Sequence, residues 1–551
     1  MTETLEQLIT KNWPKAQAHW SHFLLLSEPK DNSEQQSIAQ IHLGNRQVTL
    51  NHHTIQQQGL EDCIEALLAH EIGHHVRYPG TLATQARLRL LEKSLIPIEE
   101  YSLINLFTDI MINEQIGRTM REQLIRIYQA FDYQDSYQRD PAFLFYLAIY
   151  EELWQTEPGT LIGTAMAAFE ETYPNYRAEA QLLSQNLFYV GPNIYTQFLY
   201  FISIVCRYIK QPEPELPNNT NSNPYQCAAD EPTSEDWAEA LTPSAREKEA
   251  IRRALQEGWI NQQEADNLGD KDSLERRIMG LPGLQKGAAD GVPEIMGAYY
   301  RQQAERYLVH PPPQHVLGEA VVPTSVDDWE PQDSVQDIDW LATLLSRGEQ
   351  LGVAQPLKRN RIAEVEGYEV PLWLPKVEIY LDVSGSMPDP RYTRNAMTLA
   401  SQIMVVGAIR AGGRARALLY SDDYVAYWQW CRSEIELSRF LMHYIGSGTL
   451  FPFDKLQSSV QECGNEQPIR IIISDSDFNR NYQAHQPAAK ILAEAIQSSQ
   501  QLILLLHAPG DMTHYRAAGA TVIGVEEMDD FPKLAAQLAH ALFSEQSHEH
   551  Q

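Results

Sequence analysis

Residues 376–386, KVEIYLDVSGS, decide the fold of the C-terminal part of the chain, because an apolar run ends there in an aspartate and two serines. Similar runs recur downstream as ARALLYS (415–421), IRIIIS (469–474), QLILLLH (501–507) and TVIGV (521–525). Helical periods separate them, at about 394–410, 434–445, 453–463, 488–499 and 531–543. Short apolar strands alternating with helices are typical of a parallel sheet covered by helices. The pattern predicts an α/β domain over 371–545, with YVAYWQW (424–430) as an edge strand.

Polar side chains gather where these predicted strands end. Asp382, Ser384 and Ser386 follow the first strand, Thr449 lies in the loop sequence GSGT, and Asp475 follows IRIIIS. Open α/β sheets bind ligands at the carboxyl ends of their strands. Carboxylate and hydroxyl oxygens are hard ligands that suit Mg²⁺ or Mn²⁺. We therefore expect a divalent metal site at this edge of the sheet.

The order DxSxS, T, D resembles the metal-ion-dependent adhesion site of von Willebrand factor A-type (VWA) domains, which have a Rossmann-like α/β fold. The resemblance implies that Asp382, Ser384, Ser386 and Thr449 touch the metal directly or through water. It implies that Asp475 does so mostly through water. The sixth position is commonly filled in such domains by an acidic residue of a partner protein.

A second motif lies in the N-terminal half, where EDCIEALLAHEIGHHV (61–76) has helical apolar spacing. Residues four apart share a helix face, so His70 and His74 can offer nitrogens to one Zn²⁺. Glu71 then faces the open side of the metal, where it can act as a general base toward water. A hairpin around Gly44-Asn45 precedes this helix, and the half is predicted to be an α+β, zincin-like domain.

The third zinc ligand is sought in INLFTDIMINEQIG (104–117), where Asn105, Asp109 and Asn113 recur every four residues in an apolar helix. We expect Asp109 to be the third zinc ligand. Asn105 and Asn113 are expected to contact the ligands without touching the metal. Asn105 and Glu114 are the rival ligands, because the thermolysin-like pattern has a glutamate at the position of Asn105. A capped or solvated helix face is the non-functional alternative.

The segment from Gln211 to Glu235 is rich in Pro, Asn, Ser and acidic residues, which predicts a flexible linker. The expected domains are therefore a zincin-like domain over 1–210, a linker over 211–240, a helical or irregular connector over 241–370 and the α/β domain over 371–545.

Composition narrows the classes of function. The formal charge of −30 disfavours binding to nucleic acid or to anionic membranes, both of which need basic patches. No apolar run is long enough for a membrane span and the N-terminus lacks the features of a signal peptide, so we expect a cytoplasmic protein. Five scattered cysteines without a CxxC pair predict reduced thiols.

Together the motifs resemble bacterial proteins that pair a metallopeptidase domain with a VWA domain. The stretch DDWEPQDSVQDIDWLATLL (327–345) is also similar to VWA proteins encoded beside MoxR-type AAA+ ATPases. Two functions follow as hypotheses: a zinc peptidase whose VWA domain recruits a partner or substrate, or a non-catalytic adaptor for such an ATPase. The chain has no GxxxxGK[ST] loop and so is not itself predicted to be the ATPase.

Overall fold

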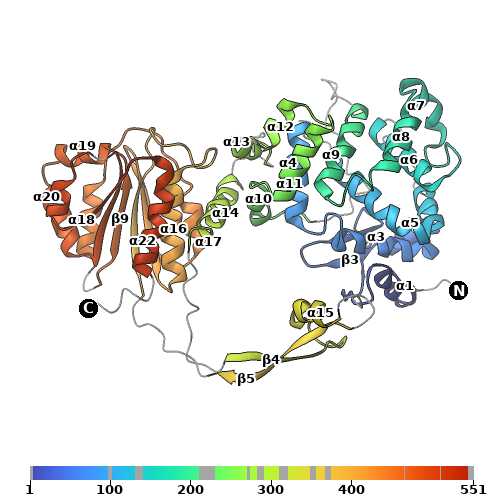
Figure 1. Ribbon diagram of the computed structural model, residues 1–551, viewed down its shortest axis with the longest axis horizontal. Coiled ribbons are helices and arrows are strands. Elements are labelled where there is room, and N and C mark those ends of the chain that lie inside the picture. The colour runs from blue at the N-terminus through green and yellow to red at the C-terminus, as the bar shows by residue number, and fades with distance from the viewer. Residues whose placement is uncertain are drawn as a thin grey trace. The chain divides into compact units, whose positions relative to one another are not determined.

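The computed structural model describes residues 4–96, 102–130, 140–209, 230–269, 273–281, 291–308, 320–347, 355–365, 374–463, 466–508 and 510–543. They form two compact units (Figure 1). The first unit comprises Met1–Gly280 and Asp327–Lys358, and the second comprises Leu281–Val326 and Arg359–Gln551. No helix in the described part of the chain is long and apolar enough to cross a membrane. The four cysteines in this part, Cys63, Cys206, Cys431 and Cys463, are free.

The first unit is mainly helical, with one small sheet near its N-terminus. Its three strands have the order β1-β3-β2 and are β1 (Lys30–Asp31), β2 (Ala39–His42) and β3 (Gln47–Leu50). The antiparallel pair β2 and β3 confirms the predicted hairpin, and β2 is an edge strand. The longer helices are α1 (Leu5–Trp20), α3 (Ile64–Val76), α4 (Leu82–Leu95), α5 (Ile104–Ala130), α6 (Pro141–Trp154), α8 (Tyr176–Asn186), α9 (Ile194–Val205) and α11 (Ala245–Gln256). Shorter helices are α2 (His52–Gln57), α7 (Met166–Thr172), α10 (Ser234–Ala240), α12 (Gln262–Gly269), α13 (Ser273–Met279) and α15 (Trp340–Arg347).

Packing divides the chain at different places from the boundaries expected from sequence. Residues 241–280, which the sequence assigns to a connector, belong to the first unit. The reason is that α11 buries Ala250, Ile251 and Ala254 in the same apolar core that holds α9. Most of the expected linker, residues 211–229, lies outside the described residues, and the end of the expected linker forms α10, which packs on α4.

The second unit contains a six-stranded, mostly parallel sheet of order β11-β10-β9-β6-β7-β8. Its strands are β6 (Lys376–Asp382), β7 (Arg414–Tyr420), β8 (Tyr424–Cys431), β9 (Ile469–Ser474), β10 (Gln501–His507) and β11 (Thr521–Val525). Only β8 is antiparallel, at one edge. These strands confirm the sequence prediction, including the edge strand, and the arrangement is consistent with a VWA-type α/β domain.

Helices cover both faces of this sheet (Figure 1). They are α16 (Ala396–Arg410), α17 (Glu434–Phe440), α18 (Phe453–Glu462), α19 (Asp477–Ala484), α20 (Ala488–Gln497), α21 (Thr513–Ala517) and α22 (Phe531–Phe543). Helix α14 (Val292–Glu305) packs on α16 and α17. A separate two-stranded sheet joins β4 (Ala320–Asp328) to β5 (Leu357–Val365).

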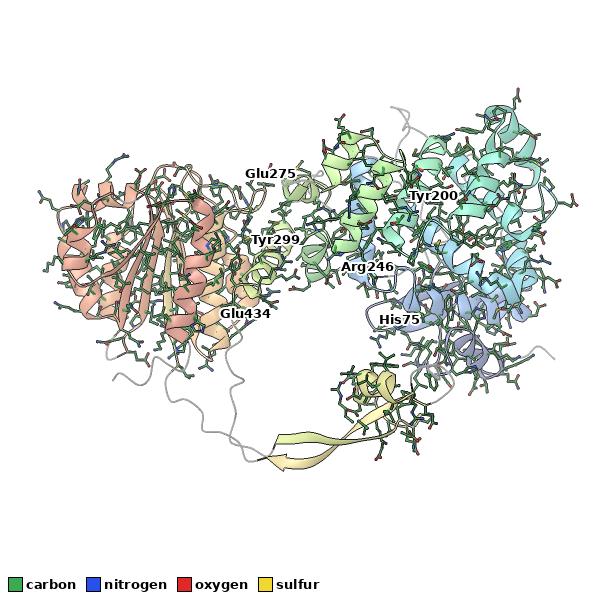
Figure 2. All side chains as sticks on the ribbon, viewed as in Figure 1. His75, Tyr200, Arg246, Glu275, Tyr299 and Glu434 are labelled. Atoms are coloured by element: carbon green, nitrogen blue, oxygen red, sulfur yellow. The ribbon has the colours of Figure 1, made fainter. Side chains whose placement is uncertain are left out.

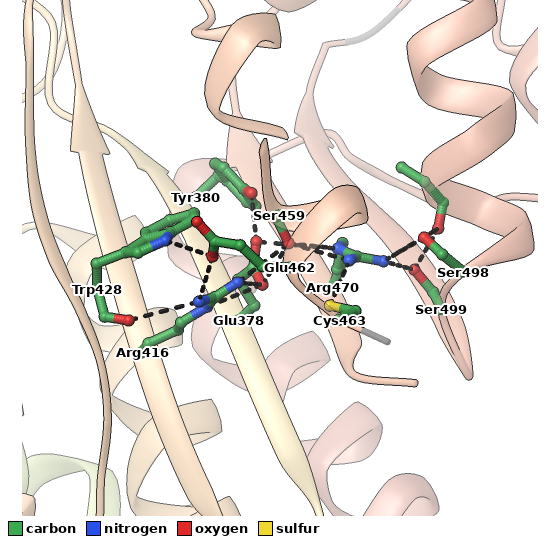
Figure 3. A network of polar contacts seen from close by, with 11 residues as sticks. Glu378, Tyr380, Arg416, Trp428, Ser459, Glu462, Cys463, Arg470, Ser498 and Ser499 are labelled. Atoms are coloured by element: carbon green, nitrogen blue, oxygen red, sulfur yellow. Dashed lines mark hydrogen bonds and ion pairs between the residues drawn. The ribbon is translucent and has the colours of Figure 1, made fainter. Parts of the chain in front are cut away.

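A buried ion cluster crosses three neighbouring strands of the large sheet (Figure 3). Glu378 on β6 accepts hydrogen bonds from Arg416 on β7 at 2.8 and 3.0 Å and from Ser459 on α18 at 2.8 Å. The guanidinium of Arg470 on β9 lies 3.8 Å from the other carboxylate oxygen. All three residues are at most 3% exposed, so the two buried arginines rely on Glu378 for charge compensation, and Arg416 also pairs with Glu462 at 3.3 Å.

Candidate functional site

Helices α3 and α5 place the candidate zinc residues side by side in the first unit. His70 and His74 lie on one face of α3, and Asp109 faces them from α5. The helices approach closely at Gly73, where a Cβ atom would lie 2.7 Å from side-chain atoms of both Ile112 and Trp20. Glycine at this position therefore lets the two helices come near enough for Asp109 to reach the histidines.

The three side chains form a buried group that could hold a metal ion, and their ligand atoms all lie within 4.8 Å of one another. The Nε2 atoms of His70 and His74 are 3.1 Å apart. Asp109 Oδ1 lies 3.7 Å from His70 Nε2 and 3.4 Å from His74 Nε2. Ligands at about 2.0–2.1 Å from a tetrahedral zinc are about 3.3 Å from each other, so the triangle has the size of one tetrahedral face.

Both histidines are oriented by contacts on their outer nitrogens. His70 Nδ1 lies 2.8 Å from Asn113 Oδ1, and His74 Nδ1 lies 2.9 Å from the carbonyl oxygen of Tyr78. An Nδ1–H that donates to an oxygen leaves the Nε2 lone pair directed at the centre of the group. Asp109 Oδ1 is buried without a hydrogen-bond partner, as expected of an oxygen that coordinates a cation. The donor set therefore fits a metal ion.

Glu71 lies beside this group, and one of its two carboxylate oxygens has no hydrogen-bond partner. The side chain is 2% exposed, and the oxygen without a partner is Oε2. Desolvation raises the pKa of Glu71 to about 8, against the opposing effects of His74 and the Ile41 backbone on edge strand β2. A carboxyl with a raised pKa beside a candidate metal group is suited to proton transfer near neutral pH.

Three buried tyrosines lie behind the metal group and were not identified from the sequence. Tyr146 donates to Asp109 Oδ2 at 3.4 Å, and its hydroxyl lies 2.7 Å from that of Tyr128 and 3.0 Å from that of Tyr150. Asn113 donates to Tyr128 and Tyr150 at 3.0 and 2.7 Å. Burial raises the pKa of all three phenols, so they remain hydrogen-bond donors. Their only sequence signal is the four-residue spacing of Tyr146 and Tyr150 on α6.

The two alternative third ligands, Glu114 and Asn105, make other contacts. Glu114 is paired with Arg118, whose Nη2 donates to Glu114 Oε1 at 2.6 Å. Asn105 is half-buried one turn before Asp109, and its backbone oxygen accepts a hydrogen bond from Thr108. The structure thus brings Asp109, and not Glu114, to the two histidines. Asn113 contacts His70 through its side-chain oxygen.

A second set of oxygen ligands lies in the other unit, where β6 and β9 end. Asp382 is fully buried, and its two oxygens accept hydrogen bonds from the Ser384 amide at 3.0 Å and from Ser474 Oγ at 2.7 Å. Ser386 Oγ lies 3.2 Å from Ser384 Oγ and donates to Asp475 Oδ2 at 3.1 Å. Burial raises the pKa of Asp382, and the neighbouring charge of Asp475 acts in the same direction. A cation would offset both effects.

The loop that carries Thr449 is tied to this cluster through its backbone. Gly385 donates its amide to Ser447 O at 2.7 Å, and Gly446 donates to Val383 O at 3.1 Å. A Cβ on Gly385 would lie 3.2 Å from Gly446 O, so a larger residue there would push the loops apart. The half-buried Thr449 is held from behind by Asn481, which donates to its carbonyl oxygen at 3.0 Å. Ser474 and Asn481 are contacts that the sequence motif did not reveal.

Comparison with known proteins gives only distant likenesses. No protein-family model and no curated protein matches the chain. Among solved structures, it is similar to a von Willebrand factor type A protein from Catenulispora acidiphila, with 14% identity and a TM-score of 0.24, over 30% of this chain and 42% of that one. It is also similar to an aerotolerance-related membrane protein from Bacteroides fragilis, with 13% identity and a TM-score of 0.23, over 30% of this chain and 98% of that one. The chain therefore spans less than half the length of the first of these proteins.

Proposed function

We propose that the first unit is a zinc-dependent metallopeptidase. The observation that carries the proposal is the buried Glu71 carboxyl, which has an unpartnered oxygen and lies beside a His-His-Asp group of tetrahedral size. His70, His74 and Asp109 would hold the ion, leaving one position open as catalytic zinc sites do. Bound zinc would supply Lewis acidity, which acidifies water and polarises a peptide carbonyl.

Within this proposal the protein side chains have separate tasks. Glu71 takes the proton of the attacking water and returns it to the leaving amine, because its carboxyl is buried and makes no competing hydrogen bond through Oε2. Asn113 and the Tyr78 carbonyl fix the histidine rings. Edge strand β2, whose Ile41 backbone contacts Glu71, is the nearest place for an extended substrate to align.

We further propose that the second unit recruits a partner or substrate protein through Mg²⁺ or Mn²⁺ held by Asp382, Ser384, Ser386, Thr449 and Asp475. The supporting observation is the chain of contacts that links four of these residues at the carboxyl ends of β6 and β9. A carboxylate from the partner would complete the coordination.

The experiment that tests the peptidase proposal compares Glu71→Gln with Glu65→Gln, a glutamate on the same helix that pairs with Lys15. Both variants and the native chain are loaded with zinc and incubated with a reduced, unfolded protein substrate. We expect the native chain and Glu65→Gln to cut the substrate, and Glu71→Gln to lose at least about 100-fold in rate while retaining zinc. Equal rates in all three would refute the assigned role of Glu71.

The alternative function is that of a non-catalytic adaptor for a MoxR-type AAA+ ATPase. The oxygen-ligand cluster of the second unit favours it, because that cluster needs no peptidase activity in order to bind a partner. Zinc retention without cleavage of any unfolded protein, together with Mg²⁺-dependent binding to such an ATPase, would support the adaptor in place of the enzyme.

A further inference from the structure

The first unit contains a cavity of about 870 Å³ whose lining includes none of the proposed metal ligands. It lies between the C-terminal end of α3, helices α4 and α5, the start of α9, and helices α10 and α11. We call it the arginine cavity, because Arg77, Arg87, Arg118 and Arg246 line it. Its size is within the range of pockets that bind organic ligands, about 300–1,000 Å³.

The carboxylates that line the cavity offset only some of its arginines. Glu114 neutralises Arg118 through an ion pair of 2.6 Å, and Glu239 contacts Arg87 at 3.1 Å. Arg77 donates to the neutral Gln115 at 3.0 Å, and no carboxylate in the described part of the chain forms an ion pair with it. Arg246, at the start of α11 (Figure 2), is exposed, and within the described residues its guanidinium has no ion-pair partner. Two uncompensated arginines in a chain of net charge −30 form a local site for anionic groups.

A buried amide provides independent evidence for a ligand. Gln197 lines the cavity and is 4% exposed, yet its Oε1 atom has no hydrogen-bond partner. A buried amide oxygen without a partner is destabilising unless a donor reaches it. The missing partner is therefore an N–H or O–H group, which an inorganic anion supplies poorly and a polypeptide backbone supplies at every residue except proline.

An exposed aromatic side chain also lines the cavity. The helix N-termini at the cavity do not form a phosphate site. Tyr189 is 84% exposed at the rim, a position typical of aromatic anchors in binding sites. Phosphate sites commonly use free amides at a helix N-terminus. Here Asn193 caps α9 and Ser244 caps α11, so an amide of each N-terminus already has a side-chain partner.

We propose that the arginine cavity binds a segment of polypeptide that carries acidic side chains. Arg77 and Arg246 bind carboxylates, Gln197 Oε1 accepts a backbone N–H, and Tyr189 packs on the chain of the ligand. This proposal does not depend on the peptidase function, because none of these four side chains belongs to the metal group.

The test measures the binding of a short fluorescent peptide of alternating Glu and Leu to the full chain by fluorescence anisotropy. All samples carry Glu71→Gln, so that cleavage does not enter the measurement. Arg246→Glu is compared with Arg252→Glu, an exposed arginine on the same helix that pairs with Glu249 and does not line the cavity. We expect Arg246→Glu to weaken binding at least about tenfold, because it removes a charge-assisted hydrogen bond and adds repulsion, and Arg252→Glu to change it less than about twofold.

A matching Lys-Leu peptide and inorganic phosphate serve as further probes. We expect neither to compete with the Glu-Leu peptide at equal concentration. The proposal is overturned if the Glu-Leu peptide does not bind, if the two charge reversals weaken it equally, or if phosphate displaces it.

Discussion

Tyr146 donates its hydroxyl proton to Oδ2 of Asp109 at 3.4 Å, while Oδ1 of the same carboxylate faces the two histidine nitrogens. The phenol therefore holds Asp109 with one oxygen turned toward the site of the ion. Asn113 joins the same network and also contacts His70, so one buried set of hydroxyl and amide groups orients two of the three candidate ligands.

Removing the Tyr146 hydroxyl should weaken the metal site without unfolding the unit. We expect Tyr146→Phe to lower zinc affinity about 10- to 100-fold, the usual cost of losing a group that orients a ligand. The matched control is Tyr176→Phe, because that tyrosine is equally buried but its hydroxyl accepts from Arg177, away from the metal group. Competition with a fluorescent zinc chelator measures both affinities, and equal values would contradict the role of Tyr146.

The second unit should lose its divalent cation when Asp382 is replaced. We expect Asp382→Ala to abolish Mg²⁺ binding, because it removes one of the two carboxylates among the five proposed ligands and leaves only Asp475. Asp454→Asn, an exposed aspartate at the start of α18, should leave binding unchanged. Isothermal titration with Mg²⁺ on zinc-loaded protein distinguishes the two variants. Retained binding in Asp382→Ala would exclude this site.

The buried ion cluster of Glu378, Arg416 and Arg470 should contribute strongly to the free energy of unfolding of the second unit. Glu378→Gln leaves the buried Arg470 without its carboxylate partner and leaves Arg416 with Glu462 alone, at 3.3 Å, which is expected to cost about 3–5 kcal/mol. Glu494→Gln removes only an exposed pair with Lys490 at 3.8 Å and should cost less than about 1 kcal/mol. Hydrogen exchange of the β6 and β9 amides measures the opening free energy of this unit alone. A similar loss in both variants would show that the cluster contributes no more than a surface pair.

Stability should also depend on pH through Glu92, which is buried on α4 and accepts a hydrogen bond from the Leu103 amide. Desolvation raises the pKa of Glu92 from 4.5 to about 7. The folded state therefore holds a proton that the unfolded state releases, so stability falls as the pH rises from 4.5 through 7.

Glu92→Gln removes this penalty. It should raise the thermal midpoint of the first unit above neutral pH, by an amount equivalent to at most about 3 kcal/mol, and the gain should shrink as the pH falls toward 4.5. Glu122→Gln, an exposed control on α5, should change the midpoint less than Glu92→Gln does above neutral pH. A pH-independent effect of Glu92→Gln would contradict this account.

The sequence predicted the strands well and the loops less well. The apolar runs IRIIIS and QLILLLH coincide with β9 and β10, because a strand buried on both faces has polar residues only at its ends. Helix α17 ends at Phe440 and not near residue 445, since the chain must then turn through Gly446, at φ 74°, to reach the oxygen-ligand cluster. Such a turn depends on contacts with Gly385 that no local pattern contains.

For the metal group, helical spacing predicted which side chains of α3 and α5 share a face. It could not predict the tyrosines of α6, because their proximity to Asp109 arises only when distant helices pack. The helical pattern of the expected connector likewise did not reveal that α11 packs in the core of the first unit.

We propose above that His70, His74 and Asp109 hold one metal ion. The most direct measurement is the zinc content of the full chain after dialysis against zinc with excess Mg²⁺, in an Asp382→Ala background that removes the second cluster. The account predicts about one zinc per chain, loss of that zinc in Asp109→Asn, and its retention in Glu65→Gln. A chain without zinc, or an Asp109→Asn variant that binds it as tightly, would contradict the account.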